Sequence, residues 1–90
     1  MTIKKLTAMP YAQAHIEIRE NATTLISYVT RVAEIENDWL TIYGLYSATT
    51  RRHIGAFVKE YAGIGYQTAK MLYNDGYRYN IKTGEIKEIG

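Results

Sequence analysis

The sequence predicts an α+β fold, an antiparallel sheet of about five strands with two helices packed on one face. Residues 14–47 carry β-type runs, residues 49–75 carry helical spacing, and residues 77–89 return to a β-type pattern. Runs of strands followed by runs of helices are typical of this class, whereas α/β folds alternate the two. The expected order is β-β-β-α-α-β-β within a single domain over residues 1–90, with residues 1–12 loosely ordered.

The first expected strand covers residues 14–20, where Ile16 and Ile18 alternate with polar neighbours. Residues 21–24, "NATT", are expected to form the turn that follows.

The strongest β signal is the pair of runs at residues 25–36 and 39–47, which Asn37 and Asp38 join. Two such residues between β-rich runs predict a tight hairpin in which Glu36 pairs with Trp39. In that register Arg31 shares the core-facing side of the hairpin with apolar residues and lies opposite Gly44.

A helix is expected next, because Ile54, Phe57, Val58 and Tyr61 keep the i, i+3, i+4, i+7 spacing of an amphipathic stripe. Its N-cap is expected at Thr49 or Thr50. A second helix over residues 66–75 is expected to stop at Gly76, and residues 77–81 and 85–89 to close the chain as a hairpin with Gly84 in a left-handed position.

The composition restricts the class of protein. With 47% hydrophobic residues, 22% charged residues and a net charge of +2, the chain does not resemble a disordered protein. The absence of cysteine excludes a disulfide scaffold, a thiolate metal site and a cysteine nucleophile. We find neither a signal peptide nor an apolar run of the roughly 18–20 residues that span a membrane, so a cytoplasmic protein without membrane contact is expected.

The candidate site lies at the expected start of the first helix, where Arg51, Arg52 and His53 follow Thr49 and Thr50. Positive charge at a helix N-terminus opposes the helix dipole, which prefers anions there. Backbone N–H groups, two hydroxyls and basic side chains together are the parts of a phosphate, carboxylate or partner-binding site. A bound anion would therefore offset the cost of these charges.

A purely structural explanation stands beside this one. Arg52 and Lys59 point away from the apolar stripe and suit a solvated face. Arg51 and His53 flank the stripe and are partly committed to the protein body, and we favour a packed or capped His53 over a catalytic one. An internal acid such as Glu60 or Glu34 would also offset the charges.

Arg31 would add to the anion site if it faces the helix, whereas a register shifted by one residue would put it on the wet face. Tyr77, Arg78 and Tyr79 form a second candidate, an aromatic contact that could stack on bases. Alternate tyrosines on a strand are more often half-buried cross-strand pairs, and we favour that reading.

No catalytic motif is present: the sequence lacks a Walker loop, G-x-G-x-x-G, H-E-x-x-H and G-x-S-x-G. It has two histidines and no acidic cluster that suggests a metal site. We therefore expect a protein that is not an enzyme and uses neither a cofactor nor a metal.

Residues 25–61 resemble a family of small uncharacterised proteins encoded by bacteriophages and related mobile elements, in which an "SY-x-T" strand precedes "YS-x-T-T-x-R-H" and a helix with a buried phenylalanine. The matching residues are Ser27, Tyr28, Thr30, Tyr46, Ser47, Thr49, Thr50, Arg52, His53 and Phe57. The resemblance implies an origin and no activity or catalytic residue. By analogy with other small phage proteins, it favours a role in binding a host factor.

The leading hypothesis is thus a non-enzymatic protein that inhibits a host factor, and two mechanisms compete. The protein could dock on a defence component, as anti-CRISPR inhibitors do, or it could sequester a nucleotide-like ligand in a cleft lined by Thr49, Thr50, Arg51, His53 and Arg31. The alternative is a nucleic-acid-binding accessory protein that uses Arg51, Arg52, Lys59 and Arg78. A homo-oligomer formed through open sheet edges is a third reading.

Overall fold

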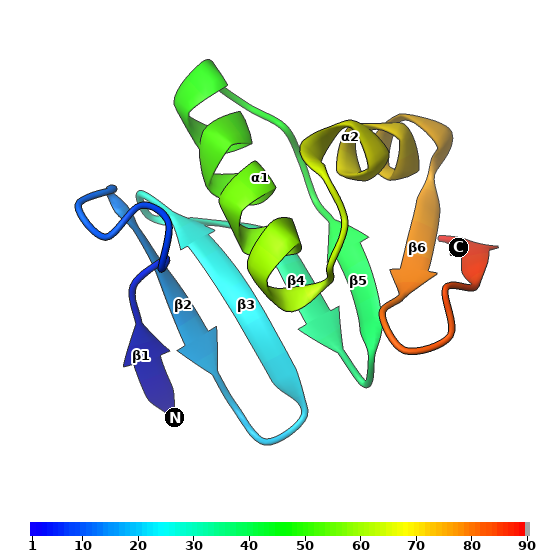
Figure 1. The fold of residues 1–90 in the computed structure, drawn as a ribbon, viewed down its shortest axis with the longest axis horizontal. Coiled ribbons are helices and arrows are strands. Elements are labelled where there is room, and N and C mark those ends of the chain that lie inside the picture. The colour runs from blue at the N-terminus through cyan, green and yellow to red at the C-terminus, as the bar shows by residue number, and fades with distance from the viewer. Residues whose placement is uncertain (90) are drawn as a thin grey trace.

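The computed structural model describes residues 1–89 and confirms the α+β class (Figure 1). One antiparallel sheet of seven strands follows the order β1-β2-β3-β4-β5-β6-β7, so each strand pairs with its neighbours in sequence. Two helices between β5 and β6 pack on one face of the sheet. The strands are β1 (Thr2–Lys4), β2 (Ala14–Ile18), β3 (Ala22–Ser27), β4 (Thr30–Glu36), β5 (Trp39–Ile42), β6 (Tyr77–Asn80) and β7 (Ile86–Glu88).

The turn between β2 and β3 lies earlier than expected. Arg19 donates its backbone N–H to the Ala22 carbonyl at 2.8 Å, so Glu20 and Asn21 make the turn. The expectation that residues 21–24 turn the chain is wrong, because the β-branched Thr23 and Thr24 pair with β2.

A second hairpin divides the run that was expected to be one strand over residues 25–36. Ser27 pairs with Thr30, so Tyr28 and Val29 form the connection between β3 and β4. Tyr28 adopts a left-handed φ of 57°, and its N–H donates to the Gln13 carbonyl at 2.7 Å. Glycine, asparagine or aspartate usually marks such a turn, and none is present here. This hairpin and β1 raise the strand number from about five to seven.

The hairpin between β4 and β5 forms in the predicted register. Glu36 pairs with Trp39, and the two loop residues Asn37 and Asp38 have φ values of 50° and 71°. Positive φ at both positions matches the right-handed twist of the strands.

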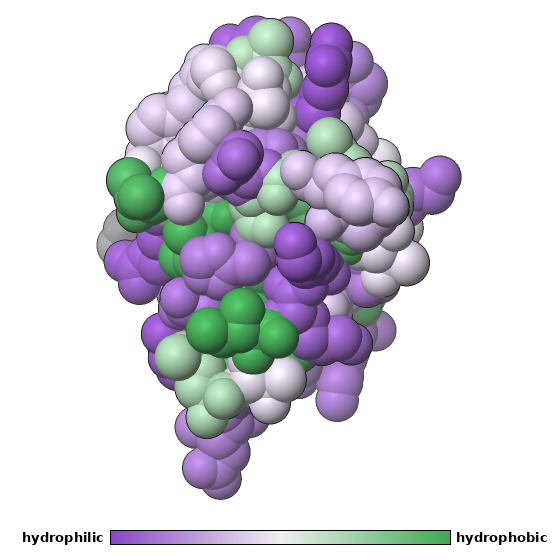
Figure 2. Space-filling model, turned by 90° about the vertical axis from the view of Figure 1, so that its left-hand side faces the viewer, coloured by the Kyte–Doolittle hydropathy of each residue, from purple (hydrophilic) through white to green (hydrophobic). Residues whose placement is uncertain are grey.

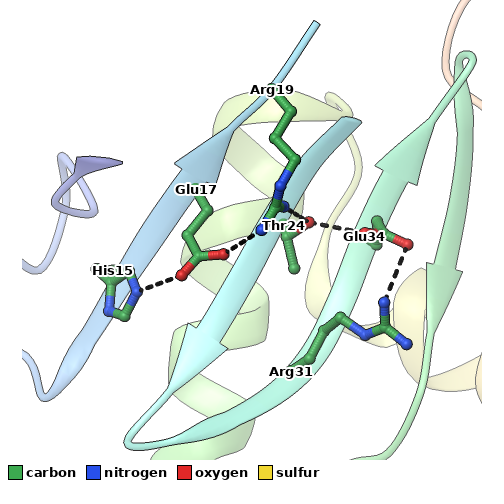
Figure 3. A network of polar contacts seen from close by, with 6 residues as sticks. All are labelled: His15, Glu17, Arg19, Thr24, Arg31 and Glu34. Carbon is green, nitrogen blue, oxygen red and sulfur yellow. Dashed lines mark hydrogen bonds and ion pairs between the residues drawn. The ribbon is translucent and has the colours of Figure 1, made fainter. Parts of the chain in front are cut away.

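A β-bulge at Val32 corrects the expected position of Arg31. Leu25 pairs with Ala33 and Ile26 pairs with Arg31, so Val32 is an extra residue without a partner across β3. The bulge reverses the alternation, and Arg31 therefore points to the face of the sheet that the helices leave open (Figure 3). The expectation that Arg31 faces the core is wrong.

The first helix, α1 (Ala48–Tyr61), buries Ile54, Phe57 and Val58 against the sheet, as its spacing predicts. Its N-cap is Ser47 and not Thr49 or Thr50, since the Ser47 Oγ accepts the Thr50 N–H at 3.2 Å.

The second helix, α2 (Tyr66–Asp75), has the predicted bounds and ends at Gly76, which is left-handed with a φ of 75°. The final hairpin forms with Gly84 at a φ of 78°. Neither helix within the described chain is long and apolar enough to cross a membrane.

The N-terminal segment takes part in both the sheet and the core. Thr2–Lys4 pairs with β2, and Leu6 is fully buried in the core between sheet and helices. Thr7 reaches α1, where its N–H and its hydroxyl both donate to the Glu60 carboxylate at 3.2 and 2.8 Å. The segment therefore closes the core beside β2 and α1.

Candidate functional site

A chain of buried polar groups joins the start of α1 to the end of β3. The Ser27 hydroxyl lies 3.0 Å from the Thr50 hydroxyl and 2.8 Å from His53 Nδ1. Ser47 extends the chain, since its hydroxyl donates to Thr50 Oγ1 at 3.3 Å. Tyr28 lies next to this network, with its ring centroid 6.0 Å from that of His53.

The inner part of the network is closed to solvent, with exposed fractions of 2% for Ser27, 4% for Thr50 and 1% for His53, whereas Ser47 at the N-cap is exposed. Burial lowers the pKa of His53, because a charged imidazole would lose its hydration there. Buried polar groups need partners, and the Ser27 hydroxyl supplies one to the Thr50 hydroxyl and one to His53 Nδ1. We conclude that the network fastens α1 to the sheet.

The anion site expected from the sequence is therefore divided. Thr50 and His53 are buried and committed to Ser27, whereas Thr49, Arg51 and Arg52 are exposed on the outside of α1. Arg31 lies on the other side of the sheet. The backbone N–H groups of Thr50 and Arg51 are also occupied, since both donate to Ser47. No common cleft gathers these residues.

The exposed arginines border a hollow on the outward side of α1. It has a volume of about 380 Å³ and is lined by Arg51, Arg52, Gly55, Ala56 and Tyr66. Neither arginine forms an ion pair with any residue between 1 and 89. The first turn of α1 holds no acidic residue either, so the charges add to the positive end of the helix dipole.

Tyr66 is the wall that α2 contributes to this hollow. A Cβ on Gly55 would lie 3.3 Å from the Tyr66 Cβ, so the glycine allows the two helices to approach closely. The Tyr66 hydroxyl is buried and has no hydrogen-bond partner among the described residues. Beyond Ala56, Lys59 and Glu60 continue the outward side of α1, but Glu60 is already bound by Thr7.

The open face of the sheet carries a network of paired charges (Figure 3). Glu17 bonds His15 Nε2 at 3.2 Å and Arg19 at 2.8 Å, and these contacts lower its pKa, the hydrogen bond from His15 most of all. Glu34 accepts from Thr24 at 2.8 Å and lies 3.8 Å from Arg31. These acids thus neutralise the neighbouring cations, as on a solvated sheet face.

Arg31 belongs to this face. Its guanidinium lies 4.7 Å from the centre of the Tyr43 ring, and the Tyr43 hydroxyl donates to Glu34 at 2.9 Å. Burial raises the pKa of Tyr43, and the Glu34 carboxylate raises it further. Arg31 is therefore paired within the sheet and does not reach α1.

The second candidate, Tyr77, Arg78 and Tyr79, divides between the two faces. Tyr77 and Tyr79 pack against the core, which agrees with the structural reading of alternate tyrosines. Arg78 lies on the open face, in a small hollow that it shares with acidic and aromatic side chains of β4 and β5. No group of three metal-ligating side chains occurs among residues 1–89.

Sequence reasoning missed Ser27, Ser47, Gly55 and Tyr66. A signal for the two serines was present, because both stand in the "SY-x-T" and "YS-x-T-T-x-R-H" motifs, which the fold brings together. Those motifs therefore describe the junction between β3 and α1. Gly55 and Tyr66 carried no such signal.

The comparison with protein families matches most of the chain, residues 2–75, to DUF8033, a family of unknown function. The chain belongs to this family. The matched region runs from β1 through α2 and so includes both the buried network and the outward side of α1. No curated protein and no solved structure matches the chain.

Proposed function

We propose that this protein is a non-enzymatic binding module that docks onto an acidic surface of a protein partner through the outward side of α1. The observation that carries the proposal is the hollow at Arg51 and Arg52, two exposed arginines without an ion pair in residues 1–89. Arginine is enriched in interface cores, where its planar guanidinium pairs with carboxylates in two-pronged geometry.

The other walls of the hollow support a protein partner. Gly55, Ala56 and Tyr66 offer an apolar floor beside the two arginines. A partner that presents an acidic side chain beside an apolar one would pair with the arginines and cover the apolar floor. The apolar floor favours a protein over a phosphate backbone, which needs no such contact.

The distribution of charge agrees with this choice. The ion pairs of the described residues lie on the open sheet face and at its hairpin, away from α1. Positive charge without nearby acids steers an acidic partner toward α1 and raises its association rate.

The positions of the cations give less support to the alternative, nucleic-acid binding by Arg51, Arg52, Lys59 and Arg78. The first three lie on α1, but Arg78 lies on the open sheet face beside Glu34. The four cations therefore do not line one surface.

We propose a host factor as the partner of this surface. The resemblance to small phage and mobile-element proteins supports an inhibitor of a host factor, with anti-defence activity as its biological role. That resemblance is the support for the inhibitor role. A nucleotide-like ligand would bind a different surface, at the edge of the sheet.

The test compares three tagged baits: the wild type, Arg51→Glu/Arg52→Glu, and the matched control Lys82→Glu/Lys87→Glu. Both double variants change the charge equally, but the control does so at the β6–β7 hairpin. After capture from a bacterial lysate treated with nuclease, the retained protein is purified and its dissociation constant is measured. We expect the arginine variant alone to lose binding, and an acid-to-lysine change in the partner to restore it.

Equal binding by all three baits would contradict the proposal. A capture that occurs from an untreated lysate and is lost after nuclease treatment would show that nucleic acid, and not a protein, is the ligand.

A further inference from the structure

A second hollow, separate from α1, lies at the edge of the sheet where β1 ends and β2 begins. It has a volume of about 500 Å³, within the usual range of small-molecule sites. The lining residues are Ile3, Lys4, Lys5, Ala12, Gln13, Ala14, His15 and Tyr28. Figure 2 shows this side of the molecule, where hydrophobic residues lie among hydrophilic ones.

The lining is positively charged. Lys4 and Lys5 form no ion pair within residues 1–89, and no carboxylate lines the hollow. Glu17 does not line the hollow, but its carboxylate lies 3.2 Å from His15 Nε2 and holds the ring. The imidazole, one of the lining groups, is thereby fixed in orientation. Lysine, histidine and amide donors around an uncharged floor are the chemistry that binds a phosphate group.

Tyr28 adds an aromatic wall. Its side chain is 52% exposed, yet its ring is positioned on one side by His53, at 6.0 Å between centroids. Its backbone is held by the bond from its N–H to the Gln13 carbonyl, which ties the β3–β4 turn to the lining. A tyrosine in the left-handed region is strained, and such strain persists where the surroundings over-determine it.

We propose that this hollow binds a nucleoside phosphate, with the phosphate at Lys4, Lys5 and Gln13 and the base on the ring of Tyr28. An exposed aromatic ring stacks on any base, and the lysines supply the charge that a phosphate needs. The site shares no residue with the docking surface on α1, so it stands or falls independently of that proposal.

The test is an NMR titration of the full chain with adenosine diphosphate, inorganic phosphate and adenosine as separate probes. Adenosine diphosphate should shift the backbone amides that line the hollow. Lys4→Ala/Lys5→Ala should weaken its binding at least about tenfold, the combined effect of two charge-assisted contacts. The control Lys70→Ala/Lys82→Ala removes two exposed lysines elsewhere and should bind as the wild type does.

Tyr28→Asn tests the aromatic wall, because asparagine tolerates the left-handed backbone that Tyr28 adopts. It should weaken the binding of adenosine diphosphate and leave that of inorganic phosphate unchanged. If Tyr28→Asn does not fold, the binding of adenosine diphosphate by Lys4→Ala/Lys5→Ala still tests the proposal. Unchanged binding by Lys4→Ala/Lys5→Ala, amide shifts at Arg51 and Arg52 instead, or adenosine diphosphate binding no tighter than phosphate would each overturn it.

Discussion

Thr49 and Thr50 are neighbours in the sequence and have opposite surroundings in the fold. Thr50 is buried and bonded to Ser27, whereas Thr49 faces solvent. Thr50→Ala should lower the free energy of unfolding by about 1–3 kcal/mol, because Ser27 loses a buried partner. Thr49→Ala should change it by less than about 0.5 kcal/mol. Urea denaturation of the two variants measures the difference, and equal losses would show that the hydroxyl network is not stabilising.

His53 makes the stability of the protein depend on pH. Its folded-state pKa lies below the ordinary histidine value because of burial, so the unfolded chain binds the proton more readily. Stability should therefore be complete above about pH 6.5, the unfolded pKa, and fall as the pH drops from there toward the folded pKa. The midpoint of urea denaturation, measured at intervals from pH 7.5 to 5, tests this.

His53→Gln should flatten that dependence, since the amide does not titrate in this range. Glu17 acts in a different window: its pKa is lowered in the fold, so its contribution is lost only below the ordinary carboxylate range. A pH dependence above pH 5 that persists in His53→Gln would contradict the assignment.

The candidate site shows what residue patterns could and could not reveal. The sequence singled out the run from Thr49 to His53, and Arg52 and Lys59 are exposed, as their solvated-face reading requires. The inward position of Thr50 and His53 depends on Ser27, more than twenty residues earlier. No local pattern reports a hydrogen bond across that separation.

At the scale of elements, the helices were the best predicted part of the chain. The 3.6-residue period and a terminal glycine are local signals, and α2 ends where Gly76 takes a φ of 75°. The β3–β4 hairpin was missed because Tyr28 and Val29 carry no turn signal and their backbone is set by the tie to Gln13. The bulge at Val32 was missed for a similar reason, because the register between β3 and β4, and no local signal, determines where the extra residue lies.

Substitutions at Gly76 test whether a left-handed residue is needed to end α2. Gly76→Ala should lower the free energy of unfolding by about 1–2 kcal/mol, because a Cβ disfavours the left-handed backbone although nothing lies within 4 Å of it. Gly76→Asn should retain more stability, as asparagine visits that region more readily. Thermal unfolding of both variants makes the comparison, and identical melting temperatures would mean that the backbone relaxes at this position.

For the whole molecule, the N-terminal segment belongs to the core. Leu6 is fully buried, while Ile3 on β1 is 61% exposed. Leu6→Ala should cost about 2–5 kcal/mol, the usual range for a buried leucine, whereas Ile3→Ala should have little effect. A small domain has only about 5–15 kcal/mol in total, so the first change should bring the protein close to unfolding at 37 °C.

Circular dichroism during thermal unfolding measures both variants. If Leu6→Ala melts at the temperature of the wild type, the segment would be a loosely ordered tail, as its sequence suggested.

The sequence by itself determined the α+β class, both helices, the β4–β5 register and the outward position of Arg52. These features depend on periodicity and turn chemistry, which act over a few residues. Only the tertiary structure decided the bulge that turns Arg31 outward, the hydrogen bond between Ser27 and His53, the hollow between α1 and α2 and the one at Tyr28. Each of these arises where segments distant in sequence meet, and packing and hydrogen bonding then override local preference.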